Sequence, residues 1–156
     1  MRRGETSKWM RQNTMLDILA EIYDSGGRLV RVRYALFEGD PRFVTAVELQ
    51  FEARSVVFRA VADDDTLAAS LGELKSELYE TLVEIGDSEQ WSSCVGYSVC
   101  WAWQLTNQQG YSDGVRLEFG EPGEGSRAVI ELIVVASAIQ MFAVAQPNNS
   151  FNQSAS

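Results

Sequence analysis

Apolar residues near the start of the chain recur at three- and four-residue spacings, the pattern of a helix with one apolar face. The recurring residues are Met15, Leu16, Ile18, Leu19, Ile22 and Tyr23. Asn13 and Thr14 supply side-chain oxygens that can cap a first helical turn, and the glycine pair Gly26 and Gly27 ends the pattern. The sequence therefore predicts a short amphipathic helix between these signals.

The period then changes to two, the spacing of a strand with one buried face. Arg31 and Arg33 fall on the polar face of the first such run, and Glu48 and Glu52 fall on the polar face of the second. These opposed charges favour antiparallel pairing of the two runs, with the ion pairs on the solvent side of the sheet. Three strands are predicted here, over 29–37, 43–52 and 56–62.

The leucines that follow the acidic turn 63–65 return to a helical spacing. They fall at Leu67, Leu71, Leu74, Leu78 and Leu82, followed by Ile85. We expect a helix over residues 71–85 with one leucine face and one acidic face. Its acidic residues, Glu73, Glu77, Glu80 and Glu84, either dock a basic partner protein or form an ordinary solvated surface. Residues 66–70 could instead extend a hairpin from the third strand.

Three of the four tryptophans and both cysteines lie in the stretch 91–119. Residues 95–105 alternate large with small side chains, which predicts a strand whose aromatic face fills the core or lines a groove, with the core favoured. A polar loop at 107–113 and renewed alternation from Val115 complete a predicted hairpin. If the aromatic face is open, a small-ligand site would be formed by Trp101, Trp103, Asn107, Tyr111 and Asp113.

The apolar runs 129–135 and 138–144 predict one or two central strands, because an exposed edge this apolar would aggregate. We expect residues 1–12 to be a mobile arm, 13–146 one globular domain, and 147–156 a disordered polar tail. The fold class is thus α+β: a mainly antiparallel sheet of about six or seven strands, with a single layer of two helices packed on it.

Charge and composition limit the kinds of partner and the location that we expect for this protein. The 156 residues carry a net charge of −9, and it is uneven: residues 1–62 hold ten basic and eight acidic groups, whereas residues 63–131 hold three and fourteen. An acidic second half argues against nucleic acid and in favour of a basic protein partner. No apolar run approaches the ~20 residues of a membrane span, and no secretory signal is recognisable, so we expect a soluble cytoplasmic protein.

Candidate chemistry is sparse in this sequence. It has no histidine, no phosphate-binding glycine loop and no nucleophile motif, so catalytic residues are not predicted and the balance is against an enzyme. The aspartates at 63–65 lack the spacing of a calcium loop, and we expect no metal and no cofactor. Cys94 and Cys100 are expected to be reduced thiols, about 20 Å apart on one extended strand.

The pattern W-x-W-x-L-x-N-x-x-G-Y-x-D at residues 101–113 resembles a stretch of small bacterial domains of unknown function, a resemblance that implies no activity. In size and acidity the chain is also similar to immunity proteins that block bacterial toxins. Our leading hypothesis is a non-enzymatic binding protein whose acidic half engages a basic protein. A small-ligand domain is the alternative, and assembly as a homodimer is a third possibility.

Overall fold

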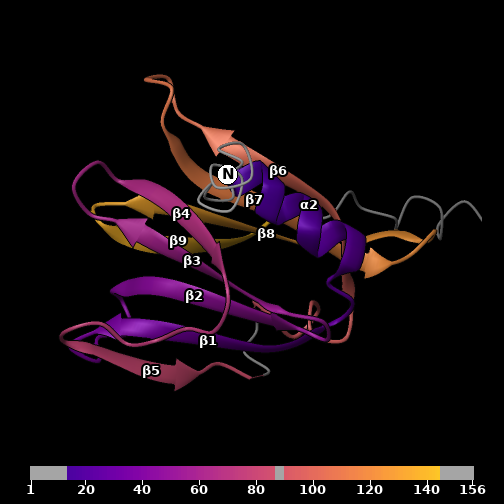
Figure 1. Ribbon diagram of the computed structural model, residues 1–156, viewed down its shortest axis with the longest axis horizontal. Coiled ribbons are helices and arrows are strands. Elements are labelled where there is room, and N and C mark those ends of the chain that lie inside the picture. Colours follow the sequence, from indigo (N-terminus) through magenta and orange to yellow (C-terminus); the bar gives the residue numbers. More distant parts are fainter. Residues whose placement is uncertain (1–13, 87–89, 145–156) are drawn as a thin grey trace, which may run out of the picture.

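The computed structural model describes residues 14–86 and 90–144, which form two antiparallel sheets and one helix (Figure 1). The first sheet contains β1 (Leu29–Phe37), β2 (Val44–Phe51), β3 (Ser55–Val61), β4 (Thr66–Leu71) and β5 (Glu80–Glu84). The second contains β6 (Ser98–Thr106), β7 (Ser112–Glu121), β8 (Gly125–Val135) and β9 (Ala138–Val144). Their orders are β4-β3-β2-β1-β5 and β6-β7-β8-β9. The fold is α+β and mostly antiparallel.

The strand count and the single sheet of the prediction are wrong: the described residues form nine strands in two sheets, and one helix rather than two. The sheets face each other, with β2 against β9 and β4 against β7. One large apolar cluster lies between them, because each sheet has a single predominantly apolar face to bury. The predicted arm 1–12 and tail 147–156 lie outside the described residues, and the single domain 13–146 stays a prediction.

Trp91 is the tryptophan of this core and is fully buried. Its indole nitrogen donates a 2.6 Å hydrogen bond to the hydroxyl of Tyr34 on β1, and its ring meets the edge of Phe119 on β7. The buried indole N–H is thereby satisfied, as a buried donor must be. Through these two contacts Trp91 joins the two sheets.

The first predicted helix is confirmed as α2 (Met15–Ser25). Thr14 and Asp17 form a capping box, in which each side chain accepts a hydrogen bond from the other's backbone nitrogen. At the other end Gly27 adopts a φ of +81°, a backbone conformation that favours glycine, and a Cβ there would lie 2.8 Å from the Glu52 carboxylate. α2 contacts β6 of one sheet and β4 of the other, and so closes one side of the sandwich.

The predicted helix 71–85 is wrong. Residues 66–71 pair with β3, as the hairpin alternative had it, and residues 80–84 pair with the edge of β1. Leu74 is buried whereas Leu78 is 78% exposed, although a helix would place them on the same face. Gly72 (φ +123°) also interrupts any helix between the two strands. Long-range pairing has overridden the local leucine pattern here.

The segment between β4 and β5 covers the outer face of the five-stranded sheet. Leu74 packs there in a small second cluster with Ala35, Ala46, Val57 and Leu82. Glu48 lies beside this cluster and is buried, with only 1% of its surface exposed. The predicted antiparallel pairing of β1 and β2 is confirmed, with Arg33 opposite Glu48, but the expected solvent position of this ion pair is wrong because the segment covers it.

The apolar C-terminal runs form β8 and β9. β8 is central, as predicted, but β9 is an edge strand, because the four-stranded sheet ends there. Its inner residue Ile139 is buried, and Phe142 on the outer face is half exposed. Cys94 lies in the turn before β6 rather than on the strand, so the two thiols do not share one extended strand; both are free.

Candidate functional site

One side of α2 remains uncovered by the core. Successive helical residues are rotated by about 100°, so the six large apolar residues of α2 spread over a wide arc. Ile18, Leu19 and Ile22 occupy its buried centre, while Leu16 and Tyr23 stand at one border and are 59% and 51% exposed. This border faces β6.

β6 is irregular where it meets the helix. Its pairing with β7 shifts between Val99 and Trp101, so Cys100 is an extra, bulged residue. In a regular strand residues 99 and 101 would point to the same face. Because of the bulge, Val99 is buried and Trp101 is turned outward, with 52% of its surface exposed. The prediction that Val95 to Leu105 is a core strand with its tryptophans inside is therefore wrong.

Three aromatic side chains form a continuous ladder across α2 and β6. Tyr23 meets Trp101 edge to face at 6.4 Å between ring centroids, and Trp101 lies 6.0 Å from Trp103. The guanidinium of Arg116 on β7 lies 5.2 Å from the centre of the Trp103 ring, within the range of a cation–π interaction. We call Tyr23, Trp101 and Trp103 the aromatic ladder.

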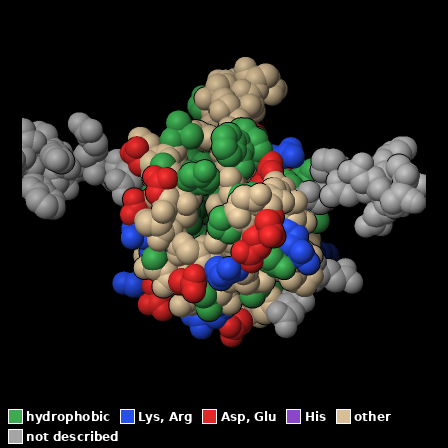
Figure 2. Space-filling view, turned by 90° about the vertical axis from the view of Figure 1, so that its right-hand side faces the viewer, with side chains coloured by type: hydrophobic (Ala, Val, Ile, Leu, Met, Phe, Trp, Pro, Cys, Tyr) green, Lys and Arg blue, Asp and Glu red, His purple; other side chains and the backbone are tan. Residues whose placement is uncertain are grey.

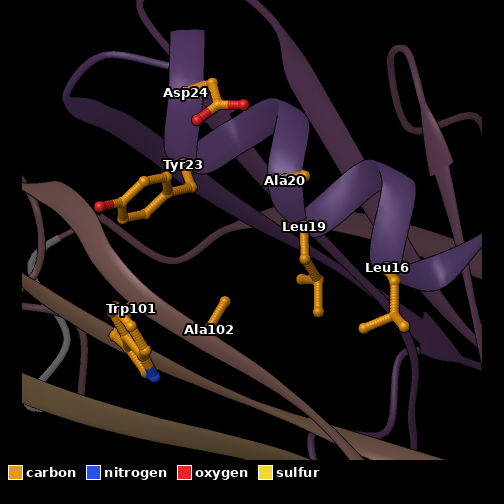
Figure 3. Close-up of a pocket in the computed structure, with 7 residues that line it drawn as sticks. All are labelled: Leu16, Leu19, Ala20, Tyr23, Asp24, Trp101 and Ala102. Carbon is orange, nitrogen blue, oxygen red and sulfur yellow. The ribbon is translucent and has the colours of Figure 1, made fainter.

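Between α2 and β6 the ladder borders an open groove of about 450 Å³ (Figure 3). In Figure 3 the Tyr23 ring points from the helix toward the strand that carries Trp101, with Leu16 at the opposite end of the groove. The groove is lined by Leu16, Leu19, Ala20, Tyr23, Asp24, Trp101 and Ala102. Its volume falls in the range of small-molecule sites, and its walls are almost entirely apolar.

Two further hollows adjoin this groove. One shares Tyr23 and Asp24 with it, and the other shares Trp101. The ladder is thus the centre of a larger concave surface. Figure 2 shows one side of the molecule, on which hydrophobic side chains gather in the upper middle and most charged side chains lie below them and to the sides.

Asp24 is the acidic residue of the groove. It stands in the last turn of α2, which has no basic residue, and it is exposed. The carboxylate of Glu121 already has a partner, because Arg28 donates two hydrogen bonds to it, at 2.7 and 3.1 Å. These bonds lower the pKa of Glu121. Within the described residues no hydrogen bond or ion pair involves the Asp24 side chain.

The structure separates the residues of the predicted small-ligand pocket. Trp101 and Trp103 stand on the ladder, whereas Asn107, Tyr111 and Asp113 belong to the tip of the β6–β7 hairpin, which projects from the body in Figure 1. The side-chain oxygen of Asn107 accepts hydrogen bonds from the backbone nitrogens of Gln109 and Tyr111 and so builds the turn. None of the three hollows around the ladder includes these tip residues.

The four glutamates of the predicted acidic helix face each form an ion pair with an arginine of the same chain. Glu80 is almost buried and bonds to Arg59 at 2.7 Å, and Glu77 lies 3.4 Å from the same guanidinium. The remaining two lie 3.8 Å from cations of β1, Glu73 from Arg33 and Glu84 from Arg31. These four glutamates thus balance the arginines of β1 and β3.

The groove offers binding contacts rather than reactive groups: apolar walls, aromatic rings and one carboxylate. Among the described residues no set of three or more Cys, Asp or Glu side chains is arranged to hold a metal ion. In the same residues no helix has the length and apolar character required to cross a membrane.

Trp101 and Trp103 could be recognised in the sequence, whereas Leu16, Tyr23 and Asp24 were missed as site residues. One signal was present: six large apolar residues in an 11-residue helix span a wider arc than its packing face needs. The bulge at Cys100 had no such signal, because it depends on the pairing of β6 with β7.

Fold and site together define a two-sheet α+β structure with an exposed aromatic groove. The chain belongs to the family described as "Family of unknown function (DUF6334)", whose model matches residues 10–148. The resemblance to domains of unknown function seen in the sequence is therefore confirmed, and the family implies no activity. Comparison with curated proteins and with solved structures gives no match.

Proposed function

We propose that this chain is a non-enzymatic binding protein and that the groove between α2 and β6 is its binding site. One observation carries the proposal: Tyr23 and Trp101 are each about half exposed and lie in contact beside an open apolar groove. Exposed apolar surface of this kind is costly in water and marks interaction sites when it is contiguous.

The local structure of β6 keeps Trp101 exposed at the groove. The bulge at Cys100 turns Trp101 out of the core, although a regular strand would have buried it beside Val99. Bulges often re-aim a side chain next to a functional site. The acidic segment with Glu73, Glu77, Glu80 and Glu84 is a weaker candidate, because each of these carboxylates already lies within 4 Å of an arginine of the same chain.

An NMR screen of small neutral and charged fragments tests the proposal and requires no known ligand. We expect the hits to concentrate on the resonances of Tyr23, Trp101 and Ala102. The variant Ala20→Arg places a long side chain in the groove at little cost to the helix and should abolish those hits. Gln140→Arg on exposed β9 is the control with the same charge change and should keep them. Hits that avoid the groove would refute the assignment.

A further inference from the structure

We infer that the groove takes an arginine side chain, flanked by apolar residues, from a basic partner protein. This inference rests on the proposed function and adds the chemistry of the ligand. It combines three features: a cation–π contact already present on the ladder, an acidic residue at the end of a helix, and an apolar floor.

The aromatic ladder already holds one guanidinium. Arg116 lies over Trp103 at 5.2 Å, and Trp101 stands directly beside it with its ring half exposed. In the described part of the chain no arginine or lysine lies over Trp101. Tryptophan is the strongest aromatic partner for a cation, and arginine is the cation most often found there. Trp101 therefore offers a second position of the same kind.

Asp24 adds charge complementarity at the same groove. The carboxyl end of a helix carries partial negative charge from its unpaired carbonyl groups, so an acidic residue there is unfavourable and a cation is favourable. α2 nevertheless carries Asp24 in its last turn and has no basic residue there. A bound guanidinium near Asp24 would neutralise the carboxylate and also interact favourably with the helix end.

The remaining walls favour an apolar neighbour over a free ion. Leu16, Leu19, Ala20 and Ala102 line the groove away from Asp24. A small inorganic or organic cation would leave this surface in water, whereas the methylene stem of arginine and an adjacent leucine would cover it. The full chain's net charge of −9 would also attract a basic protein in solution.

The test uses two peptides and the full chain. Ac-Leu-Arg-Leu-NH2 is compared with the same peptide in which citrulline, a neutral isostere, replaces arginine, and binding is followed by NMR at the four tryptophan indole N–H groups. We expect the arginine peptide to shift the Trp101 signal saturably and to bind about tenfold more tightly than the citrulline peptide. Its affinity should fall with added salt.

Two variants with the same charge change separate the role of Asp24 from a general charge effect. Asp24→Asn should weaken the arginine peptide about tenfold and leave the citrulline peptide unchanged. It should leave the melting temperature unchanged or slightly higher, because it removes a negative charge from the helix end. Asp113→Asn, at the hairpin tip, should bind both peptides as the wild type does.

The outcomes distinguish this inference from the proposed function. Equal binding of both peptides in the groove would overturn the arginine assignment and leave the binding site standing. Binding of neither peptide would also overturn it, and the fragment screen would then decide separately whether the groove is a site. Loss of binding in Asp113→Asn but not in Asp24→Asn would contradict the placement of the cation.

Discussion

The carboxylate of Glu48 on β2 accepts a 2.6 Å hydrogen bond from Nε of Arg33 on β1, in a position where only 1% of the glutamate surface is exposed. Its second oxygen accepts a 2.8 Å bond from the backbone nitrogen of Leu74. The pair therefore ties the segment between β4 and β5 to the outer face of the five-stranded sheet. This arrangement replaces the predicted helix.

Removal of the Glu48 carboxylate should be strongly destabilising. Glu48→Ala would leave Nε of Arg33, whose side chain is 19% exposed, and the N–H of Leu74 without their acceptors. We expect the free energy of unfolding to fall by about 3–5 kcal/mol in urea titrations. Glu84→Ala removes an exposed ion pair of Arg31 and should cost no more than ~1 kcal/mol. Equal losses in the two variants would contradict a structural role for the buried pair.

The hydrogen bond between Trp91 and Tyr34 should also be measurable. Tyr34→Phe keeps the ring but leaves the buried indole N–H without an acceptor, so we expect a loss of ~1–3 kcal/mol in chemical denaturation. Tyr111→Phe at the exposed hairpin tip is the matched control and should change stability by less than ~0.5 kcal/mol. A neutral Tyr34→Phe would show that the bond contributes nothing net.

Acid stability should depend on Glu80. Burial raises the pKa of this carboxyl, but hydrogen bonds from Arg59, Thr45 and the Glu77 nitrogen outweigh that effect and hold the pKa below its ordinary value. A depressed folded-state pKa stabilises the fold above the unfolded value of about 4.5 and loses that contribution as pH falls through the folded value. Glu80→Gln should therefore show a flatter decline of stability below about pH 4.5. A wild-type slope in Glu80→Gln would contradict this contribution.

The two thiols should differ sharply in reactivity. Burial raises the pKa of Cys94 to about 12, whereas Cys100 is partly exposed. Since the thiolate is the reactive form, a disulfide reagent at about pH 8 should label Cys100 in the native protein and both cysteines only in denaturant. Cys100→Ser should abolish the native reaction. Rapid labelling of Cys94 in that variant would contradict its buried position.

Local signals in the sequence account for the parts of the fold that were predicted. The capping residue Thr14 and the glycines after α2 act on neighbouring residues, and the period of two is itself a local pattern, so α2 and the first three strands could be recognised. The segment 71–85 could not, because its structure depends on Glu48 and Arg59, which lie far away in the sequence. Its leucine spacing resembled a helix by coincidence.

The candidate site was predictable only in part for the same reason. Trp101 and Trp103 are conspicuous in the sequence, and their place on one face of the predicted strand left a groove open as the alternative to the core. Their partners Tyr23 and Asp24 come from a helix near the start of the chain, and only the packing of α2 against β6 brings them together. This proximity depends on how α2 packs against the two sheets and not on any local sequence pattern.

The central claim, that the face with Tyr23 and Trp101 binds a partner protein, is tested most directly by photo-crosslinking in cells that naturally express the chain. p-Benzoylphenylalanine replaces Tyr23 in one version and Phe142, half exposed on the opposite edge strand β9, in the other. The account predicts a discrete protein adduct from position 23 that disappears when Ala20→Arg is added, and none from position 142. An adduct from position 142 with none from position 23 would contradict it.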